Sequence, residues 1–233
     1  MIAATPATVG ERSPAYTSAA NRAFFKVAKS VFRAFSFIYL RLSITGRQNF
    51  PSHGGFVVAP GAHRSIVDTA VVAVSSKRML RFMGAESYFE TPVLGWFLRS
   101  CGGFPVERGS TDRDAMRVAE EVLRSGEPLV IFPEATRYSG PEVQPLKDGA
   151  AFLAARAGVP IVPIGIGGGE RSWPKGAKFL KPTRMAIIVG KPIYAERPAD
   201  GSRVRRSEVK RVTAQLHASL QSLFNEAQAS AKA

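Results

Sequence analysis

The first strong pattern of hydrophobic and polar positions runs from Arg22 to Ser43. Four basic residues in it are spaced so that they fall along one side of an α-helix: Arg22, Lys26, Lys29 and Arg33. The opposite side is apolar and rich in phenylalanine. A helix packed on the protein's own core would show a similar pattern, but the aromatic residues and the wholly basic polar side favour a helix lying in a membrane interface. We therefore predict a membrane-interface amphipathic helix at residues 22–45, preceded by a mobile tail at 1–21.

From Gly54 onward, short β-like runs alternate with helical patterns. We expect strands at 56–59, 81–83, 104–106, 129–132, 161–166 and 185–189. Apolar spacing and terminal glycines predict helices at 111–124 and 147–157, and a basic helix follows from 203 to about 227. Such alternation predicts an α/β fold with a largely parallel central sheet flanked by helices. This domain is placed at residues 46–227, with a second mobile tail at 228–233.

Charge and cysteine content narrow the classes of partner. The formal net charge of +14 attracts anionic lipid, nucleic acid or acidic substrates. Nucleic acid is disfavoured, because the chain has no zinc-finger spacing, RNA-binding consensus or basic region leading into heptads. The lone Cys101 allows no intramolecular disulfide and no multi-cysteine metal site. No stretch approaches the ~20 apolar residues that cross a bilayer, so we expect one-sided, peripheral contact with the cytoplasmic face of the cell membrane.

A histidine and an aspartate stand five positions apart, directly after the strand-like run FVVAP. On one continuous helix, His63 and Asp68 would point about 140° apart and would not meet. The Pro-Gly pair after the strand favours a turn, so His63 can lie in a loop that folds back over a helix opening near Ser65. Asp68 would then hold one imidazole tautomer and leave the other nitrogen free to take a proton. The alternative is that His63 caps a helix and Asp68 pairs with Arg64.

Two further segments also follow predicted strands. In GGFPVERGS, Arg108 stands between a strand and a helix start, which suits an anion such as a phosphate monoester, although an ordinary pair with Glu107 fits equally. In IFPEATRYSG, Glu134 and Arg137 lie on a loop, where they could pair with each other, bind a ligand, or do both. Ligands of α/β sheets collect outside the carboxyl ends of the strands, so we expect the three segments to converge there.

These three segments, in this order, resemble the acyltransferase family that includes 1-acylglycerol-3-phosphate acyltransferase and glycerol-3-phosphate acyltransferase. The hallmark of that family is a histidine, four residues and an aspartate, which HRSIVD matches. GGFPVER, FPEATR and VPIVPIGI resemble its second, third and fourth blocks, and the resemblance covers roughly Phe50 to Lys191. The ordered set, rather than any single block, makes the resemblance specific.

The resemblance implies a reaction and a role for each residue. His63 would deprotonate an acceptor hydroxyl, which attacks an acyl thioester, while Asp68 orients His63. Arg108, Glu134 and Arg137 would bind the acceptor's phosphate. The implied donor is acyl-CoA or acyl carrier protein, the implied acceptor is lysophosphatidic acid, and no metal or other cofactor is expected. Another lysolipid or glycolipid acceptor is the first alternative, and a non-catalytic protein that binds anionic lipid or nucleic acid is the second.

Three alanines depart from the pattern of the family. Ala135 stands where glycine is usual, which is harmless only if that residue has a negative φ. Ala62 precedes His63 where asparagine is frequent, so a loop hydrogen bond is expected to be missing. Ala85 stands where many relatives carry lysine, which removes one possible phosphate contact.

Overall fold

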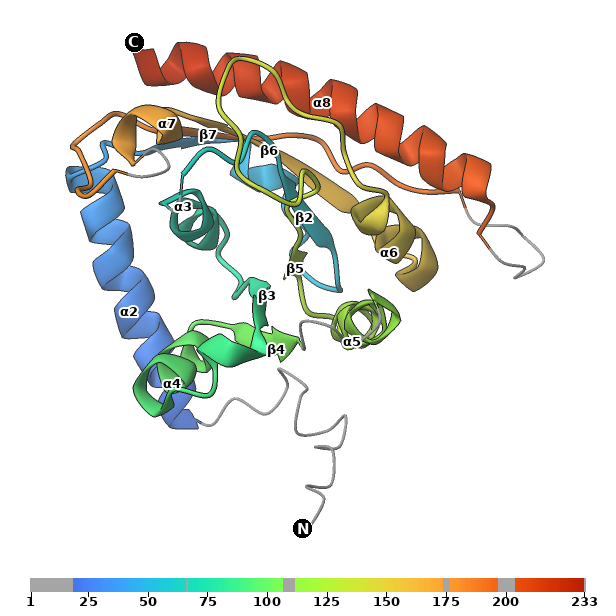
Figure 1. Ribbon diagram of the computed structural model, residues 1–233, viewed down its shortest axis with the longest axis horizontal. Helices are drawn as coiled ribbons and strands as arrows, with labels where there is room; N and C mark the ends of the chain where they lie inside the picture. Colours follow the sequence, from blue (N-terminus) through green and yellow to red (C-terminus); the bar gives the residue numbers. More distant parts are fainter. Residues whose placement is uncertain (1–18, 66, 107–111, 174–176, 197–203, 233) are drawn as a thin grey trace.

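The protein is described here from a computed structural model, in which residues 19–65, 67–106, 112–173, 177–196 and 204–232 are placed (Figure 1). In this part of the chain, the strands form one sheet in the order β1-β7-β6-β2-β5-β3-β4. Their bounds are β1 Ser43–Thr45, β2 Val57–Pro60, β3 Arg81–Ala85, β4 Gly103–Val106, β5 Leu129–Val130, β6 Ile161–Gly167 and β7 Ala186–Val189. The block from β6 to β4 is parallel, whereas β7 runs antiparallel to β6 and β1 runs parallel to β7.

Helices cover both faces of this sheet (Figure 1). Their bounds are α2 Ala19–Ile38, α3 Val67–Ser75, α4 Pro92–Ser100, α5 Asp112–Arg124, α6 Gly149–Ala157, α7 Gly169–Ser172 and α8 Arg206–Lys232. Alternate strand residues point to opposite faces, so Val57 packs with α5, α6 and α8, while Val58 packs with α2 and α3. The predicted α/β fold with a largely parallel sheet is confirmed, and the predicted strands and the helices at 111–124 and 147–157 are found within a few residues of their expected bounds, whereas the helix predicted at 22–45 ends at Ile38.

The sequence did not predict β1. Residues 43–45 were assigned to the amphipathic helix, but α2 ends at Ile38 and Ser43 to Thr45 pair with β7. Three residues are too short to show the alternation of a strand, and this one exists because β7 offers it a hydrogen-bonding edge. Of the predicted tail, residues 1–18 lie outside the described part of the chain, and residues 19–21 begin α2.

The predicted tail at residues 228–233 is wrong for residues 228–232, which continue α8 to Lys232. Ala227 and Ala231 are buried against β7, and the Gln228 Oε1 accepts a hydrogen bond from the Gly168 N–H at 3.1 Å. A Cβ on Gly167 would lie only 2.1 Å from the Ala227 carbonyl oxygen. The small residues that looked like a frayed tail therefore let the helix sit directly on the sheet.

One side of α2 packs on the core, and another side is exposed. Phe32, Phe35 and Tyr39 pack on the core beside α3, and the Lys29 ammonium donates hydrogen bonds to carbonyl oxygens at the end of α3, including that of Ser76 at 2.7 Å. A second apolar stripe is exposed to solvent; it consists of Val27, Val31, Ala34 and Ile38. Among the helices described, none is long and apolar enough to span a membrane.

Candidate active site

The predicted site residues that the structure describes gather at one edge of the sheet, where parallel strands end. His63 follows β2, Glu134 follows β5, and Gly169 follows β6, and these three strands are neighbours with β2 in the middle. The chain therefore leaves adjacent strands in the same direction and brings three loops together at the edge of the sheet where α/β proteins bind ligands.

His63 and Asp68 meet as the sequence predicts. The His63 Nδ1 lies 3.1 Å from the Asp68 Oδ2, because residues 61–65 form a loop that folds back over the start of α3. The same Oδ2 accepts hydrogen bonds from the backbone N–H groups of Arg64 and Ser65, both at 2.7 Å. Asp68 is fully buried, which keeps its carboxylate in this one position. The alternative pairing of the Asp68 carboxylate with the Arg64 guanidinium is not observed.

The two nitrogens of His63 lie in different surroundings. Nδ1 faces the buried carboxylate, whereas Nε2 has no hydrogen-bond partner among the described residues. The His63 side chain is 15% exposed, so a small group from solvent or a bound substrate can reach it. The Phe132 ring lies 4.3 Å from the imidazole, centroid to centroid, and covers one side of it. This arrangement suits a general base whose orientation is fixed.

Glu134 fixes the backbone of the histidine loop. Its Oε1 accepts a hydrogen bond from the His63 N–H at 3.1 Å, and its Oε2 accepts one from the Gln144 N–H at 2.9 Å. The same Oε2 lies 3.5 Å from the Arg64 guanidinium, and both of these side chains are buried. The pair of Glu134 with Arg137, one of the possibilities that the sequence left open, is not observed. Both carboxylate oxygens of Glu134 are thus engaged in joining two loops, and its role in binding substrate stays a prediction.

Of the two predicted phosphate-binding arginines, the structure describes Arg137 but not Arg108. The Arg137 guanidinium has no hydrogen-bond or ion-pair partner within the part of the chain that is described, so it is available to an anion. Arg108 lies outside the described residues. The strand before it, β4, ends at Val106 on the same edge of the sheet as β2.

Gly169 is a site residue that the sequence pattern did not reveal. The Asp68 Oδ1 is buried and has no hydrogen-bond partner among the described residues, and a Cβ on Gly169 would lie 2.4 Å from it. Any larger residue at position 169 would therefore displace the carboxylate that orients His63. The only available signal is the run of glycines in GIGGGE after a predicted strand.

Two of the three unusual alanines adopt left-handed backbone conformations. Ala62 has a φ of 56° and Ala135 a φ of 62°, and they lie in the two loops that build the site. Ala135 would be harmless only with a negative φ, and its φ is positive. A non-glycine residue in the left-handed region costs about 1–2 kcal/mol of conformational free energy. The third alanine, Ala85, is the last residue of β3.

The described residues contain no group of three or more His, Cys, Asp and Glu side chains that could hold a metal ion. Cys101 is partly buried, and burial raises the pKa of its thiol, which leaves it less reactive than a free cysteine. The chemistry that this site can support is proton transfer at the His63 Nε2.

Comparison with known proteins finds acyltransferases. Residues 41–167 match the acyltransferase family profile. A chloroplastic 1-acyl-sn-glycerol-3-phosphate acyltransferase of Brassica napus is 30% identical over 68% of this chain and 47% of its own length. The 1-acyl-sn-glycerol-3-phosphate acyltransferase of Bacillus subtilis is 29% identical over 66% of this chain and 74% of its own length. The chain thus spans about half the length of the plant relatives.

A solved structure has the same fold. The crystal structure of the 1-acyl-sn-glycerophosphate acyltransferase from Thermotoga maritima superposes with a TM-score of 0.67 and 23% identity, covering 92% of this chain and 87% of that one. The profile match includes β2, β5 and β6 and the loops that carry His63, Asp68 and Glu134. The family profile matches more than half of this chain, and the Brassica napus relative is 30% identical over 68% of this chain, so this chain belongs to the acyltransferase family.

Proposed function

We propose that this protein transfers a fatty acyl group from an acyl thioester to the free hydroxyl of lysophosphatidic acid, forming phosphatidic acid for phospholipid synthesis. The observation that carries the proposal is the pair of His63 and the fully buried Asp68, 3.1 Å apart, with the His63 Nε2 left open. A protein that only binds lipid needs no base held by a buried carboxylate.

The reaction follows from the open nitrogen. The His63 Nε2 takes the proton of the acceptor hydroxyl while the hydroxyl oxygen forms a bond to the thioester carbonyl carbon. Asp68 stabilises the imidazolium that results. The C–S bond then breaks, and the thiolate that leaves receives the proton from His63. Because a thiolate leaves readily, a positioned base can suffice without a covalent acyl-enzyme.

Two arginines support the proposal that the acceptor carries a phosphate. The Arg137 guanidinium, in the loop that also carries Glu134, has no partner among the described residues, and Arg108 follows β4 in sequence. Relatives from Brassica napus and Bacillus subtilis are named for 1-acyl-sn-glycerol-3-phosphate, a lipid of this kind.

We further propose that the protein works at the cytoplasmic face of a membrane, held there by exposed apolar residues on α2 and α4. The stripe of Val27, Val31, Ala34 and Ile38 on α2 continues toward Val93, Leu94, Trp96 and Phe97 on α4. Phe24 joins the two helices, since its ring lies 4.5 Å from that of Trp96. The exposed Lys26 and Arg33 border the stripe, as expected for a helix among anionic headgroups.

An acceptor panel tests the reaction. Purified protein is given acyl-CoA and vesicles containing lysophosphatidic acid, a lysolipid with a different headgroup, or monoacylglycerol, and the acylated products are identified by mass spectrometry. We expect phosphatidic acid to form fastest. Equal turnover of monoacylglycerol would contradict the phosphate site, and no acylated product from any acceptor would contradict acyl transfer. A separate measurement of protein bound to the same vesicles tests the membrane proposal. Replacing Val27 and Val31 with Asp should reduce that binding.

A further inference from the structure

Four cationic side chains from distant parts of the sequence surround one cavity at the β1–β7 end of the sheet. They are Arg41, Arg171, Arg184 and Lys232, and we call them the cationic cluster. The cavity has a volume of about 430 Å³, and its remaining lining residues carry no acidic side chain. The four side chains are exposed, so they are not part of the core.

Among the described residues, no carboxylate lines the cavity of the cationic cluster, although Glu170 lines the adjoining one with Arg171 and Lys232. None of the four cationic side chains forms an ion pair with a described residue, and the one hydrogen bond that they make there runs from the Arg171 guanidinium to the Ala231 carbonyl oxygen at 2.8 Å. Four like charges around one hollow repel one another and create a positive local field. A bound anion with several charges would remove that repulsion, and phosphate groups fit arginine side chains well.

The topology places the cluster on the same edge of the sheet as His63. Arg41 and Arg184 precede β1 and β7, which run opposite to β2, whereas Arg171 follows β6, which runs parallel to it. All three therefore lie where β2 ends. Neighbouring strands are about 4.8 Å apart, so β7 and β1 lie roughly 10 and 14 Å from β2.

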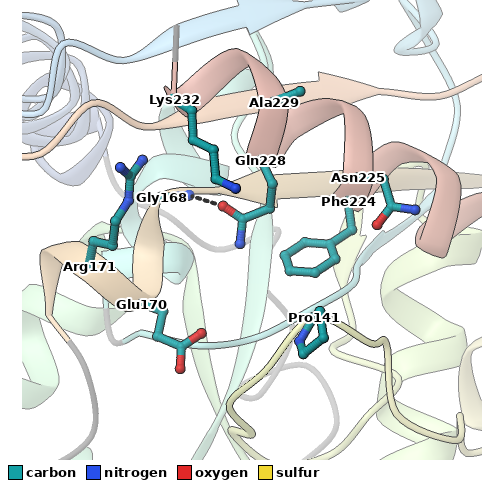
Figure 2. A pocket seen from close by; sticks show the side chains of 9 residues that line it. All are labelled: Pro141, Gly168, Glu170, Arg171, Phe224, Asn225, Gln228, Ala229 and Lys232. Carbon is teal, nitrogen blue, oxygen red and sulfur yellow. Dashed lines mark hydrogen bonds between the residues drawn. The ribbon is translucent and has the colours of Figure 1, made fainter.

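A second cavity adjoins the cluster (Figure 2). Its volume is about 510 Å³, and Arg171 and Lys232 line both cavities. Figure 2 shows these two residues at one end of it, with Phe224 and Pro141 at the other. Gly168 lines this cavity, and the next residue, Gly169, contacts the Asp68 carboxylate. The second cavity therefore reaches Gly168, one residue before the glycine that lies beside Asp68.

We propose that the cationic cluster binds the phosphate groups of coenzyme A when acyl-CoA is the donor, an inference that rests on the proposed function. In acyl-CoA, a pantetheine arm separates the thioester from a diphosphate and a 3′-phosphate. The donor therefore needs cations away from His63 but on the same edge, which is where the cluster lies. The loop that carries Arg137 follows β5, which lies on the other side of β2 from β6, β7 and β1. Donor and acceptor phosphates would then bind on opposite sides of His63.

The test measures binding without turnover. Coenzyme A and adenosine 3′,5′-diphosphate are titrated by calorimetry into the wild type and into Arg41→Gln/Arg184→Gln, whose mutated side chains form no hydrogen bonds with described residues. Lys77→Gln/Arg206→Gln, which removes two exposed charges elsewhere, is the matched control. We expect the first variant to bind both probes at least roughly tenfold more weakly, and the control to bind them like the wild type.

Vesicle binding tests whether the cationic cluster binds the phosphates of lipid headgroups rather than those of coenzyme A. Binding to phosphatidylglycerol vesicles should be the same in both double variants. The inference is overturned if the wild type does not bind coenzyme A, if both variants lose affinity equally, or if only vesicle binding falls. A wild type that binds coenzyme A through the cluster but forms no acylated lipid would refute the proposed function alone. A wild type that forms phosphatidic acid, with coenzyme A affinity unchanged in Arg41→Gln/Arg184→Gln, would refute this inference alone.

Discussion

Asp68→Asn separates the charge of Asp68 from its hydrogen bonds. The Asp68 Oδ2 accepts hydrogen bonds from the backbone N–H groups of Arg64 and Ser65, at 2.7 Å, and lies 3.1 Å from the His63 Nδ1. The amide oxygen of an asparagine can still accept from both backbone groups, so the loop keeps its shape. The asparagine cannot supply the negative charge that stabilises an imidazolium.

The size of the effect follows from that distance. Two unit charges about 4 Å apart near a protein surface attract by about 4 kcal/mol, which corresponds to roughly a thousandfold in rate. We therefore expect the kcat of Asp68→Asn to fall about 10³-fold, with a loss in unfolding free energy of only about 1–2 kcal/mol. Asp68→Ala, which leaves two buried N–H groups without an acceptor, should cost about 2–6 kcal/mol.

The assay pairs thiol release from acyl-CoA with urea unfolding, so that a lost fold is not mistaken for lost chemistry. Asp68→Ala is the control for the structural part of the effect. An Asp68→Asn variant with turnover within tenfold of the wild type would refute the argument that this carboxylate stabilises the charged base.

Three further predictions follow from other contacts. Glu134→Gln should lower the free energy of unfolding by about 3 kcal/mol or more, because it leaves the buried Arg64 without its counter-charge; a loss under 1 kcal/mol in urea unfolding would contradict this. Ala135→Gly should raise stability by up to ~1 kcal/mol, since relief of the left-handed strain exceeds the entropy that glycine costs, and thermal unfolding checks it. Burial and two neighbouring arginines lower the pKa of Lys29 to about 8. Above pH 8, the Lys29 of the unfolded chain therefore still holds a proton that the folded protein has lost, so the free energy of unfolding rises with pH. Between pH 7.5 and 9.5 the free energy of unfolding of the wild type should increase on the order of 1 kcal/mol relative to that of Lys29→Gln. A difference between the two proteins that does not change with pH would contradict this.

The sequence predicts most of the fold because buried parallel strands are long enough to show as apolar runs. Ile161–Gly167 is fully buried and was predicted almost in full. β1 was missed because it depends on pairing with β7, which no local pattern records. The end of α8 was missed for a related reason, since Ala231 contributes little apolar area and is buried only because the sheet lies close beneath it.

In the candidate site, too, contacts set by local sequence could be predicted and contacts set by three-dimensional packing could not. The contact between His63 and Asp68 could be predicted, because a turn after the strand is a local property and it sets where the helix begins. The partners of Glu134 could not be predicted, since they come from residues 63, 64 and 144 in three dimensions. The contact between Gly169 and Asp68 likewise depends on the packing of β6 beside β2.

The central claim is that the His63 Nε2 removes the proton from the acceptor hydroxyl. The most direct test is the single-turnover rate of thiol release from acyl-CoA in the presence of lysophosphatidic acid, for the wild type and for His63→Ala on the same vesicles. We expect His63→Ala to bind the vesicles and unfold like the wild type, with its rate reduced to the background hydrolysis of the thioester. A rate close to that of the wild type would contradict the account.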